Sequence, residues 1–251
     1  MPRFFIQKEQ IDGDFLTING NDAHHISRSL RMAAGEHITV CDMQKNEYEC
    51  VLRDFLPDCV RAEIIDSHHA DTEPPYSVHL YQALPKGDKL DSIIQKAVEC
   101  GVSEITTFES ERCVVKVRDG GEAKKIERRR RIALEAAMQS GRGIVPEVHE
   151  SISFASAIKA AAEADITLFC YEGDGPCSVK ECIEAWRAKN PTCTSPTVSV
   201  VIGSEGGFSL REAQMAQEAG LTPTGLGKRI LRTETASGFV LACLVYALEL
   251  T

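Results

Sequence analysis

A glycine-rich stretch near the C-terminal end carries the densest chemical signal in the sequence, Val200-Val-Ile202-Gly203-Ser204-Glu205-Gly206-Gly207-Phe-Ser209. An apolar segment typical of a buried strand ends at Gly203, and Ser209 with Glu212 has the spacing of a capping box, which begins a helix. In open α/β sheets, ligands bind beyond the carboxyl ends of strands, where glycines let the backbone approach them. We expect a ligand pocket here, with a tight turn that needs glycine for positive φ as the alternative.

A second glycine segment ends in charged residues that could act on a bound substrate. It reads Gly225-Leu226-Gly227-Lys-Arg-Ile230-Leu231-Arg232-Thr233-Glu234-Thr235 and precedes an apolar helix. Thr233 or Thr235 is predicted to cap that helix. An arginine beside the positive end of a helix does not stabilise the helix dipole. Arg232 is therefore expected to face an anion or a developing negative charge, with a surface pair to Glu234 as the alternative.

Neither glycine segment matches a common phosphate-binding motif. The first lacks the Gly-Lys-Ser/Thr of a P-loop, and the second lacks the third glycine of a dinucleotide fingerprint. Glu205 would repel a pyrophosphate, but it would tolerate a ribose hydroxyl or a cationic centre such as a sulfonium. The pattern therefore argues against a pyrophosphate ligand, but it does not identify which other ligand binds.

Alternating strands and helices are predicted to position these loops. The expected strands are 78–84, 104–108, 166–170 and 198–202. The expected helices are 90–99, about 122–139, one beginning at 210 and one near the C-terminal end, and 182–189 continues the alternation. Such alternation predicts an α/β fold, a parallel sheet covered by helices.

Residues 1–72 have a different rhythm and are expected to form a separate domain. Short segments with strand composition at 15–18, 37–41, 49–52 and 59–65 are separated by Gly, Asn and Asp, which predicts a small barrel or sandwich. A polar stretch with paired prolines follows at 71–75 and is typical of a linker. We therefore expect domains at 1–72 and 73–251.

A basic surface is predicted within the first domain. Placed on a helix, Arg28 and Arg31 share one side with His24, opposite the apolar side formed by Ala23, Ile26 and Leu30. Taken by itself, this pattern is typical of a solvated basic face. A second basic cluster comprises Lys124, Lys125, Arg128, Arg129, Arg130 and Arg131. The formal net charge of −9 argues against a general nucleic-acid coat protein, but a local phosphate-binding patch remains compatible with it.

The composition indicates a globular protein of a reducing compartment. The chain has 251 residues, 43% of them hydrophobic, and ten cysteines without a CxxC pair. Its first residues show no signal-peptide core, so we expect a cytoplasmic protein with reduced, mostly buried cysteines. The histidines, including His68, His69 and His79, show no metal-ligand spacing, and no metal is expected. The longest apolar run, 239–248, is too short to span a bilayer, and no membrane partner is expected.

These segments together resemble the 16S ribosomal RNA uridine-N3 methyltransferases of the SPOUT superfamily. The resemblance extends over nearly the whole length and is most specific at the end of the second glycine segment. It rests on His25-Ile-Ser-Arg28-Ser-Leu-Arg31-Met, Gln82-Ala-Leu-Pro-Lys86-Gly-Asp-Lys89 with Ile94-Gln-Lys96, Ser110-Glu-Arg112-Cys113, and the two glycine segments.

The resemblance implies an S-adenosylmethionine-dependent enzyme that methylates N3 of a uridine in 16S ribosomal RNA of the small ribosomal subunit. It further implies a PUA-like N-terminal barrel, a C-terminal trefoil knot and a homodimer with the helix from Phe239 at its interface. The implied cofactor pocket comprises Tyr171, Glu172, Ile202, Gly203, Ser204, Glu205, Gly206, Gly207, Leu226, Gly227, Ile230, Leu231, Arg232, Thr233 and Thr235.

The resemblance also implies residue roles. Arg232 would stabilise the uracil anion, and Glu234 or Glu205 would assist deprotonation, the two being unranked. The expected RNA contacts are Arg28, Arg31, Lys86, Lys89, Arg112, Lys124, Lys125, Arg128 and Arg142. The sequence departs from the family at Ser204, where proline is usual, and at Met138, where glutamate is usual. The alternatives are a nucleotide- or NAD-binding Rossmann-like oxidoreductase and a non-catalytic ribosomal-RNA-binding assembly factor.

Overall fold

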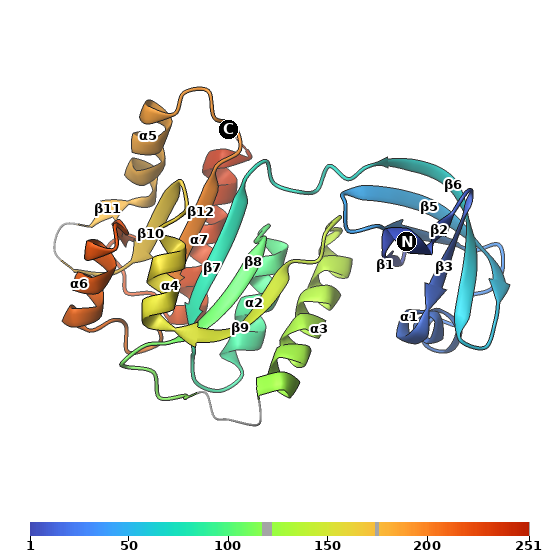
Figure 1. Ribbon diagram of the computed structural model, residues 1–251, viewed down its shortest axis with the longest axis horizontal. Helices are drawn as coiled ribbons and strands as arrows, with labels where there is room; N and C mark the ends of the chain where they lie inside the picture. The colour runs from blue at the N-terminus through green and yellow to red at the C-terminus, as the bar shows by residue number, and fades with distance from the viewer. Residues whose placement is uncertain (117–121, 174–175, 251) are drawn as a thin grey trace. The chain divides into compact units, whose positions relative to one another are not determined.

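The computed structural model describes residues 1–116, 122–173 and 176–250 and consists of two compact units (Figure 1). The first unit comprises Met1–Glu73 and Ala137–Val145, and the second comprises Pro74–Ala136 and Pro146–Thr251. Segment 137–145 therefore packs with the first unit although it lies far along the chain from the rest of that unit. A boundary drawn between two consecutive stretches of sequence could not assign it there.

The first unit is built on one mixed sheet. Its strand order is β1 (Arg3–Phe5), β4 (His37–Cys41), β5 (Asn46–Phe55), β6 (Cys59–His69), β3 (Phe15–Asn19) and β2 (Ile11–Asp12). All neighbours are antiparallel except β1 and β4, and a short 3-10 helix, η1 (Lys8–Gln10), precedes β2. Alternating side chains such as Leu16, Ile38 and Val60 form its apolar core. The predicted barrel or sandwich is thus a six-stranded sheet with β1 and β2 at its edges.

The predicted basic helix is shorter than its apolar pattern suggested. Helix α1 (Gly20–His24) continues as a π-helical turn, η2 (His25–Ser29), and ends there. Arg31 lies beyond the helix with a left-handed φ of 52°, and Leu30 is 41% exposed instead of buried. The prediction was wrong at this end because the left-handed Arg31 ends the helix, and the Met32 N–H donates back to the Ile26 carbonyl at 3.0 Å.

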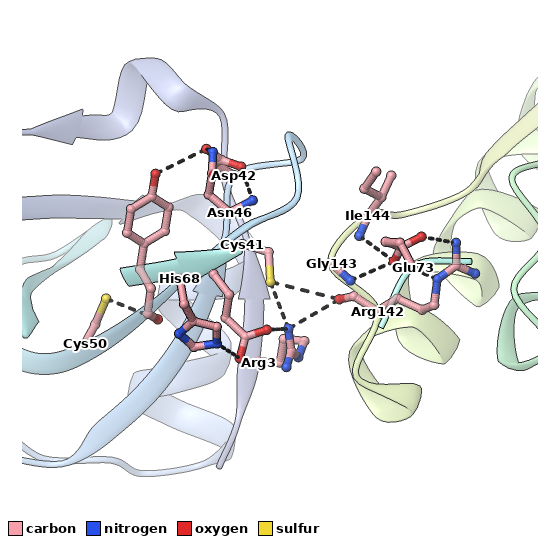
Figure 2. Close-up of polar contacts among 12 residues, drawn as sticks. Arg3, Cys41, Asp42, Asn46, Cys50, His68, Glu73, Arg142, Gly143 and Ile144 are labelled. Atoms are coloured by element: carbon pink, nitrogen blue, oxygen red, sulfur yellow. Dashed lines mark hydrogen bonds and ion pairs between the residues drawn. The ribbon is translucent and has the colours of Figure 1, made fainter. Parts of the chain in front are cut away.

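Arg142 forms a buried ion pair with Glu73 in the first unit, beside Gly143 and Ile144 (Figure 2). Its guanidinium donates to Glu73 through Nε at 2.8 Å and Nη2 at 2.6 Å, and the side chains of the pair are 5% and 6% exposed. The Gly143 N–H donates to the same carboxylate at 2.9 Å. Arg142 was predicted to contact RNA, but its guanidinium serves this buried pair, so we do not assign it to an RNA surface.

The second unit has a seven-stranded parallel sheet, as the strand–helix alternation predicted. Its strand order is β11 (Cys177–Ser178), β13 (Pro223–Gly225), β10 (Ile166–Cys170), β12 (Thr197–Ile202), β7 (Ser77–Ala83), β8 (Glu104–Glu109) and β9 (Glu147–Ser153). Its helices are α2 (Lys89–Glu99), α3 (Glu122–Ser140), α4 (Phe154–Ala161), α5 (Val179–Lys189), α6 (Leu210–Glu218) and α7 (Thr233–Leu248).

Helices cover both faces of this sheet (Figure 1). Helix α4 packs on one face of the central strands. Helices α2 and α7 pack against each other on the other face of the sheet. The elements that periodicity missed are β9, α4 and the short strand β11, whereas the strand end expected at Gly225 is that of β13. Strand β13 is three residues long and contains Pro223 and Gly225, so only its pairing with β10 and β11 makes it a strand.

The ten cysteines form no disulfide in the structure, and few of them are buried. Only Cys41, Cys50 and Cys113 are fully buried, whereas Cys177 and Cys193 are exposed. The expectation of mostly buried thiols was therefore wrong. Among the described residues, none of the helices has the length and apolar character needed to cross a membrane.

Candidate active site

A cavity of about 480 Å³ lies beyond the carboxyl ends of β10, β12 and β13. Both glycine segments and the turn after β10 line it. Of the predicted pocket residues, those that line it are Tyr171, Glu172, Ile202, Gly203, Ser204, Glu205, Gly206, Gly207, Leu226, Ile230, Leu231, Arg232 and Thr233. Gly227 and Thr235 do not line it. The structure adds Arg112, Cys170, Phe208, Leu210, Thr224 and Ala236.

The first glycine segment is a tight turn, and Gly206 and Gly207 are required there for different physical reasons. Gly207 has a φ of +62°, and its N–H donates to the Ser204 carbonyl at 2.9 Å. At Gly206 the constraint is steric, because a Cβ would lie 2.9 Å from Arg112 Cβ. Ser209 then caps α6 by accepting from the Glu212 N–H at 3.1 Å, which confirms the predicted capping box.

The segment 110–113 packs against the glycine turn and explains the position of Arg112. One guanidinium nitrogen of Arg112 donates to the Gly206 carbonyl at 3.0 Å, and the Glu111 N–H donates to the buried Glu212 carboxylate at 2.8 Å. Arg112 was predicted as an RNA contact. The structure places it in the pocket wall, where it fixes the turn and leaves part of its charge toward the cavity.

Thr233 links three elements beneath the pocket. Its hydroxyl donates to the Gly203 carbonyl at 2.7 Å and accepts from the buried Gln82 amide at 2.9 Å. The end of β12, the end of β7 and the start of α7 are therefore held together at one buried atom. The N-cap of α7 is Arg232, without a side-chain cap bond, so the predicted threonine cap was wrong. Thr233 serves this internal link instead.

Arg232 lies at the pocket wall as an exposed side chain at the first turn of α7. Its carbonyl accepts from the Thr235 and Ala236 N–H groups at 2.9 and 2.8 Å, so its backbone is fixed. The exposed N–H end of a helix favours negative charge, and the guanidinium adds a cation there. The corner can therefore stabilise an anion that forms on a substrate in the pocket.

Glu205 and Glu234, unranked from sequence, have different surroundings. Lys89 Nζ lies 2.8 Å from the Glu205 carboxylate and 3.4 Å from that of Glu234, and the Lys86 N–H also donates to Glu205 at 3.1 Å. Burial alone would raise the pKa of Glu205, but the bonds from Lys89 and Lys86 outweigh it and lower the pKa. Glu205 also raises the pKa of Lys89 through their hydrogen bond. Glu205 is thus a weak base that anchors the turn.

The comparisons with known proteins match this geometry over the whole chain. The RNA methyltransferase domain family matches residues 72–245, and the RNA methyltransferase PUA domain family matches residues 18–54. The ribosomal RNA small subunit methyltransferase E of Bacillus subtilis is 36% identical over 100% of this chain and 98% of its own length. The chain belongs to the ribosomal RNA small subunit methyltransferase E family.

Two further relatives extend the family assignment. The ribosomal RNA small subunit methyltransferase E of Mesomycoplasma hyopneumoniae is 33% identical over 96% of this chain and 97% of its own length. The crystal structure of the ribosomal RNA small subunit methyltransferase E of Neisseria gonorrhoeae, bound to S-adenosyl methionine, has a TM-score of 0.85 and 31% identity. The match covers 98% of this chain and 97% of that chain.

The basic residues that were predicted to contact RNA fall into two groups: some are exposed, and others pair with carboxylates. Arg28 and Arg31 in the first unit, and Lys86 and Lys124 in the second, are exposed. In the cluster on α3, Arg128 pairs with Asp91, Arg129 is buried against Glu122 at 2.9 Å, and Lys125 lies 3.9 Å from Glu122. The cluster is therefore partly neutralised and does not form one continuous basic face.

The two departures from the family pattern lie in different surroundings. Ser204 lines the pocket, and its hydroxyl oxygen is buried without a hydrogen-bond partner among the described residues. Met138 packs against the apolar core of the first unit. An apolar side chain suits that position, and a glutamate there would have to reach solvent or a cation. Met138 therefore has no part in the pocket.

Proposed function

We propose that this chain is an S-adenosylmethionine-dependent methyltransferase that methylates N3 of a uridine in 16S ribosomal RNA of the small ribosomal subunit. The observation that carries the proposal is the cavity between the two glycine segments, in a fold that matches a relative bound to S-adenosyl methionine. The family membership favours this activity over a Rossmann-like oxidoreductase and over a non-catalytic assembly factor. Such an enzyme acts in the cytoplasm, where ribosomal subunits are assembled.

The pocket residues fit this cofactor. The buried Ser204 hydroxyl has no partner among the described residues, and it lines the cavity beside Gly203, Gly206 and Gly207. The wall contains the carboxylates of Glu172 and Glu205, which suit a cationic sulfonium better than a pyrophosphate. When bound, S-adenosylmethionine supplies an activated methyl group, and its sulfur keeps the electron pair of the broken bond.

The chain's own residues must then orient uracil, take the N3 proton and stabilise the charge. Arg232 would donate to a uracil carbonyl oxygen as negative charge develops. Glu234 is the base that we favour, directly or through a water, because Glu205 is committed to Lys89 and Lys86. Lys89 lies between the carboxylates and would hold both in place.

We place the RNA contacts at Arg28 and Arg31 in the first unit and at Lys86, Lys124 and Lys125 in the second. Phosphate contacts supply affinity, and base recognition must come from the pocket. The first unit would act as a PUA-like RNA-binding module, as the match of its residues 18–54 suggests.

The knot and the dimer are further parts of this proposal. Strand β13 pairs with β10 on one side and β11 on the other, although β10 and β11 follow each other in the chain. A later segment inserted in this way supports the trefoil topology. An apolar groove between α5 and α7 includes Phe239, 40% exposed, and Tyr246, 69% exposed, and would receive a second copy of the chain. Light scattering at micromolar concentration should give a dimer, and a stable monomer there contradicts this interface.

Methyl transfer from labelled S-adenosylmethionine tests the activity directly. The purified chain should label small ribosomal subunits or 16S ribosomal RNA, and mass spectrometry of the digested RNA should identify N3-methyluridine. Comparing free RNA with assembled subunits defines the substrate. Binding of the cofactor without any labelling of either substrate would favour the assembly factor. Melting shifts with NADH and none with S-adenosylmethionine would favour the oxidoreductase.

A further inference from the structure

Three polar side chains from adjacent strands meet at the opposite end of the second unit's sheet from the pocket. His79 is on β7, Glu104 on β8 and His149 on β9, and one ligand atom of each lies within 4.8 Å of the others. His79 and Glu104 are 25 residues apart in the sequence, and Glu104 and His149 are 45 residues apart. Because of these long separations, and because β9 was not predicted, the sequence showed no metal-ligand spacing. Strand register brings them together: His79 pairs with Glu104, and His149 pairs with Thr106 two residues further along the same strand face.

The hydrogen bond on His79 directs one ring nitrogen toward Glu104. Nε2 lies 2.7 Å from the Thr106 hydroxyl, and the Tyr81 ring stacks on the imidazole at 4.0 Å between centroids. With the Nε2 proton donated to Thr106, Nδ1 carries a lone pair, and it faces the Glu104 carboxylate at 3.6 Å. In this tautomer the lone pair faces a carboxylate, and a cation between the two would stabilise the arrangement.

Glu104 connects both histidines. Its Oε2 accepts from His149 Nε2 at 2.8 Å and lies 3.6 Å from His79 Nδ1. If the His149 proton moves to the other ring nitrogen, Nε2 becomes a ligand without any change in the charge of the ring. Glu147 adds a second carboxylate 3.8 Å from His149 and completes a possible fourth position.

We propose that His79, Glu104 and His149 form a zinc(II) site that ties together β7, β8 and β9. Two imidazoles and a carboxylate are a common zinc ligand set, and a water or Glu147 would occupy the fourth position. The three ligand atoms already lie within 4.8 Å of one another, and zinc bonds of ~2.0–2.2 Å would draw them around one ion. The site lies at the amino ends of the strands, whereas the pocket lies at the carboxyl ends, so its role is to stabilise the sheet edge.

Zinc binding by the tag-free full-length chain tests this proposal. Competition with a chromophoric chelator should give one zinc ion per chain, and His149→Ala and His79→Ala should each abolish it. Thr106→Val removes only the partner of His79 and should weaken binding by roughly 10-fold or more. The matched control, His68→Ala with His69→Ala in the first unit, should bind as the parent does.

Cobalt(II) distinguishes this site from the thiols. The chain has exposed Cys177 and Cys193, and a cysteine site would give an intense thiolate-to-cobalt charge-transfer band. Nitrogen and oxygen ligands give weak visible bands without it, and this is the expected spectrum. Three results would each overturn the proposal: thiolate absorption, unchanged zinc binding in both histidine variants, or no zinc bound at all. The three side chains would then form only a hydrogen-bonded cluster. If an alanine variant does not fold, Glu104→Gln, which keeps the side-chain shape, replaces it in the zinc-binding measurement and should also lose the ion.

Discussion

Arg232 and Arg142 show how the same side chain serves two different purposes in this molecule. Arg142, in the 137–145 segment of the first unit, is buried and donates two hydrogen bonds to Glu73. Arg232 is exposed at the pocket wall, and only its backbone is fixed. A buried, paired charge maintains structure, whereas an exposed charge held beside a cavity remains available for a ligand. Each prediction below tests one side of this contrast.

The largest effect is expected from Arg142→Ala. It leaves the Glu73 carboxylate buried without its cation and should lower the free energy of unfolding by about 3–5 kcal/mol. Urea denaturation measures the loss. Replacing both partners with apolar side chains should recover much of it, because no unpaired charge is left. A loss below about 1 kcal/mol would mean that water reaches the pair.

Arg232→Ala should leave stability nearly unchanged and slow catalysis. The barrier to single-turnover methylation should rise by roughly 2–4 kcal/mol, as for the loss of an oxyanion donor, with RNA affinity almost intact. Arg229→Ala is the matched control, since Arg229 is an exposed arginine of the same segment outside the pocket wall. Normal turnover of the Arg232 variant at saturating RNA would exclude a catalytic role.

Glu234→Gln and Glu205→Gln should separate a base from an anchor. Glu234→Gln is expected to lower the single-turnover rate by about 100-fold and to change its pH profile, because the proton acceptor is lost. Glu205→Gln should keep the profile of the parent and lose about 10-fold or less, since the amide can still accept from the Lys86 N–H. Rate profiles against pH decide between them, and the reverse pattern would assign the base to Glu205.

The smallest effect is expected from removing Arg28 and Arg31 together. Two lost phosphate contacts should lower the slope of log affinity against log salt by roughly 1.4–1.8, with cofactor binding unchanged. Arg53→Ala is the control, because Arg53 lies in the same unit but pairs with Glu63 at 2.6 Å. RNA affinity equal to the parent at several salt concentrations would make the Arg28 and Arg31 surface a solvated face.

The sequence by itself determined the parallel α/β unit, the small β unit, the glycine turn with its capping box, and most of the pocket wall. Each was predicted from a local pattern, such as the period of apolar residues, the spacing of a capping box or the position of glycines. The residues at the ends of predicted strands were located correctly for the same reason. In a parallel sheet the carboxyl ends lie at one edge whatever the strand order.

Only the tertiary structure decided what long-range partners do to each charge. Arg142 meets Glu73 across 69 residues, Lys89 meets Glu205 across 116, and His149 meets Glu104 across 45. Such pairs depend on strand order and register, which composition and local spacing do not encode. The burial of a charged side chain and its contacts in the folded structure therefore determine whether it can bind RNA, stabilise a turn or bind a metal ion.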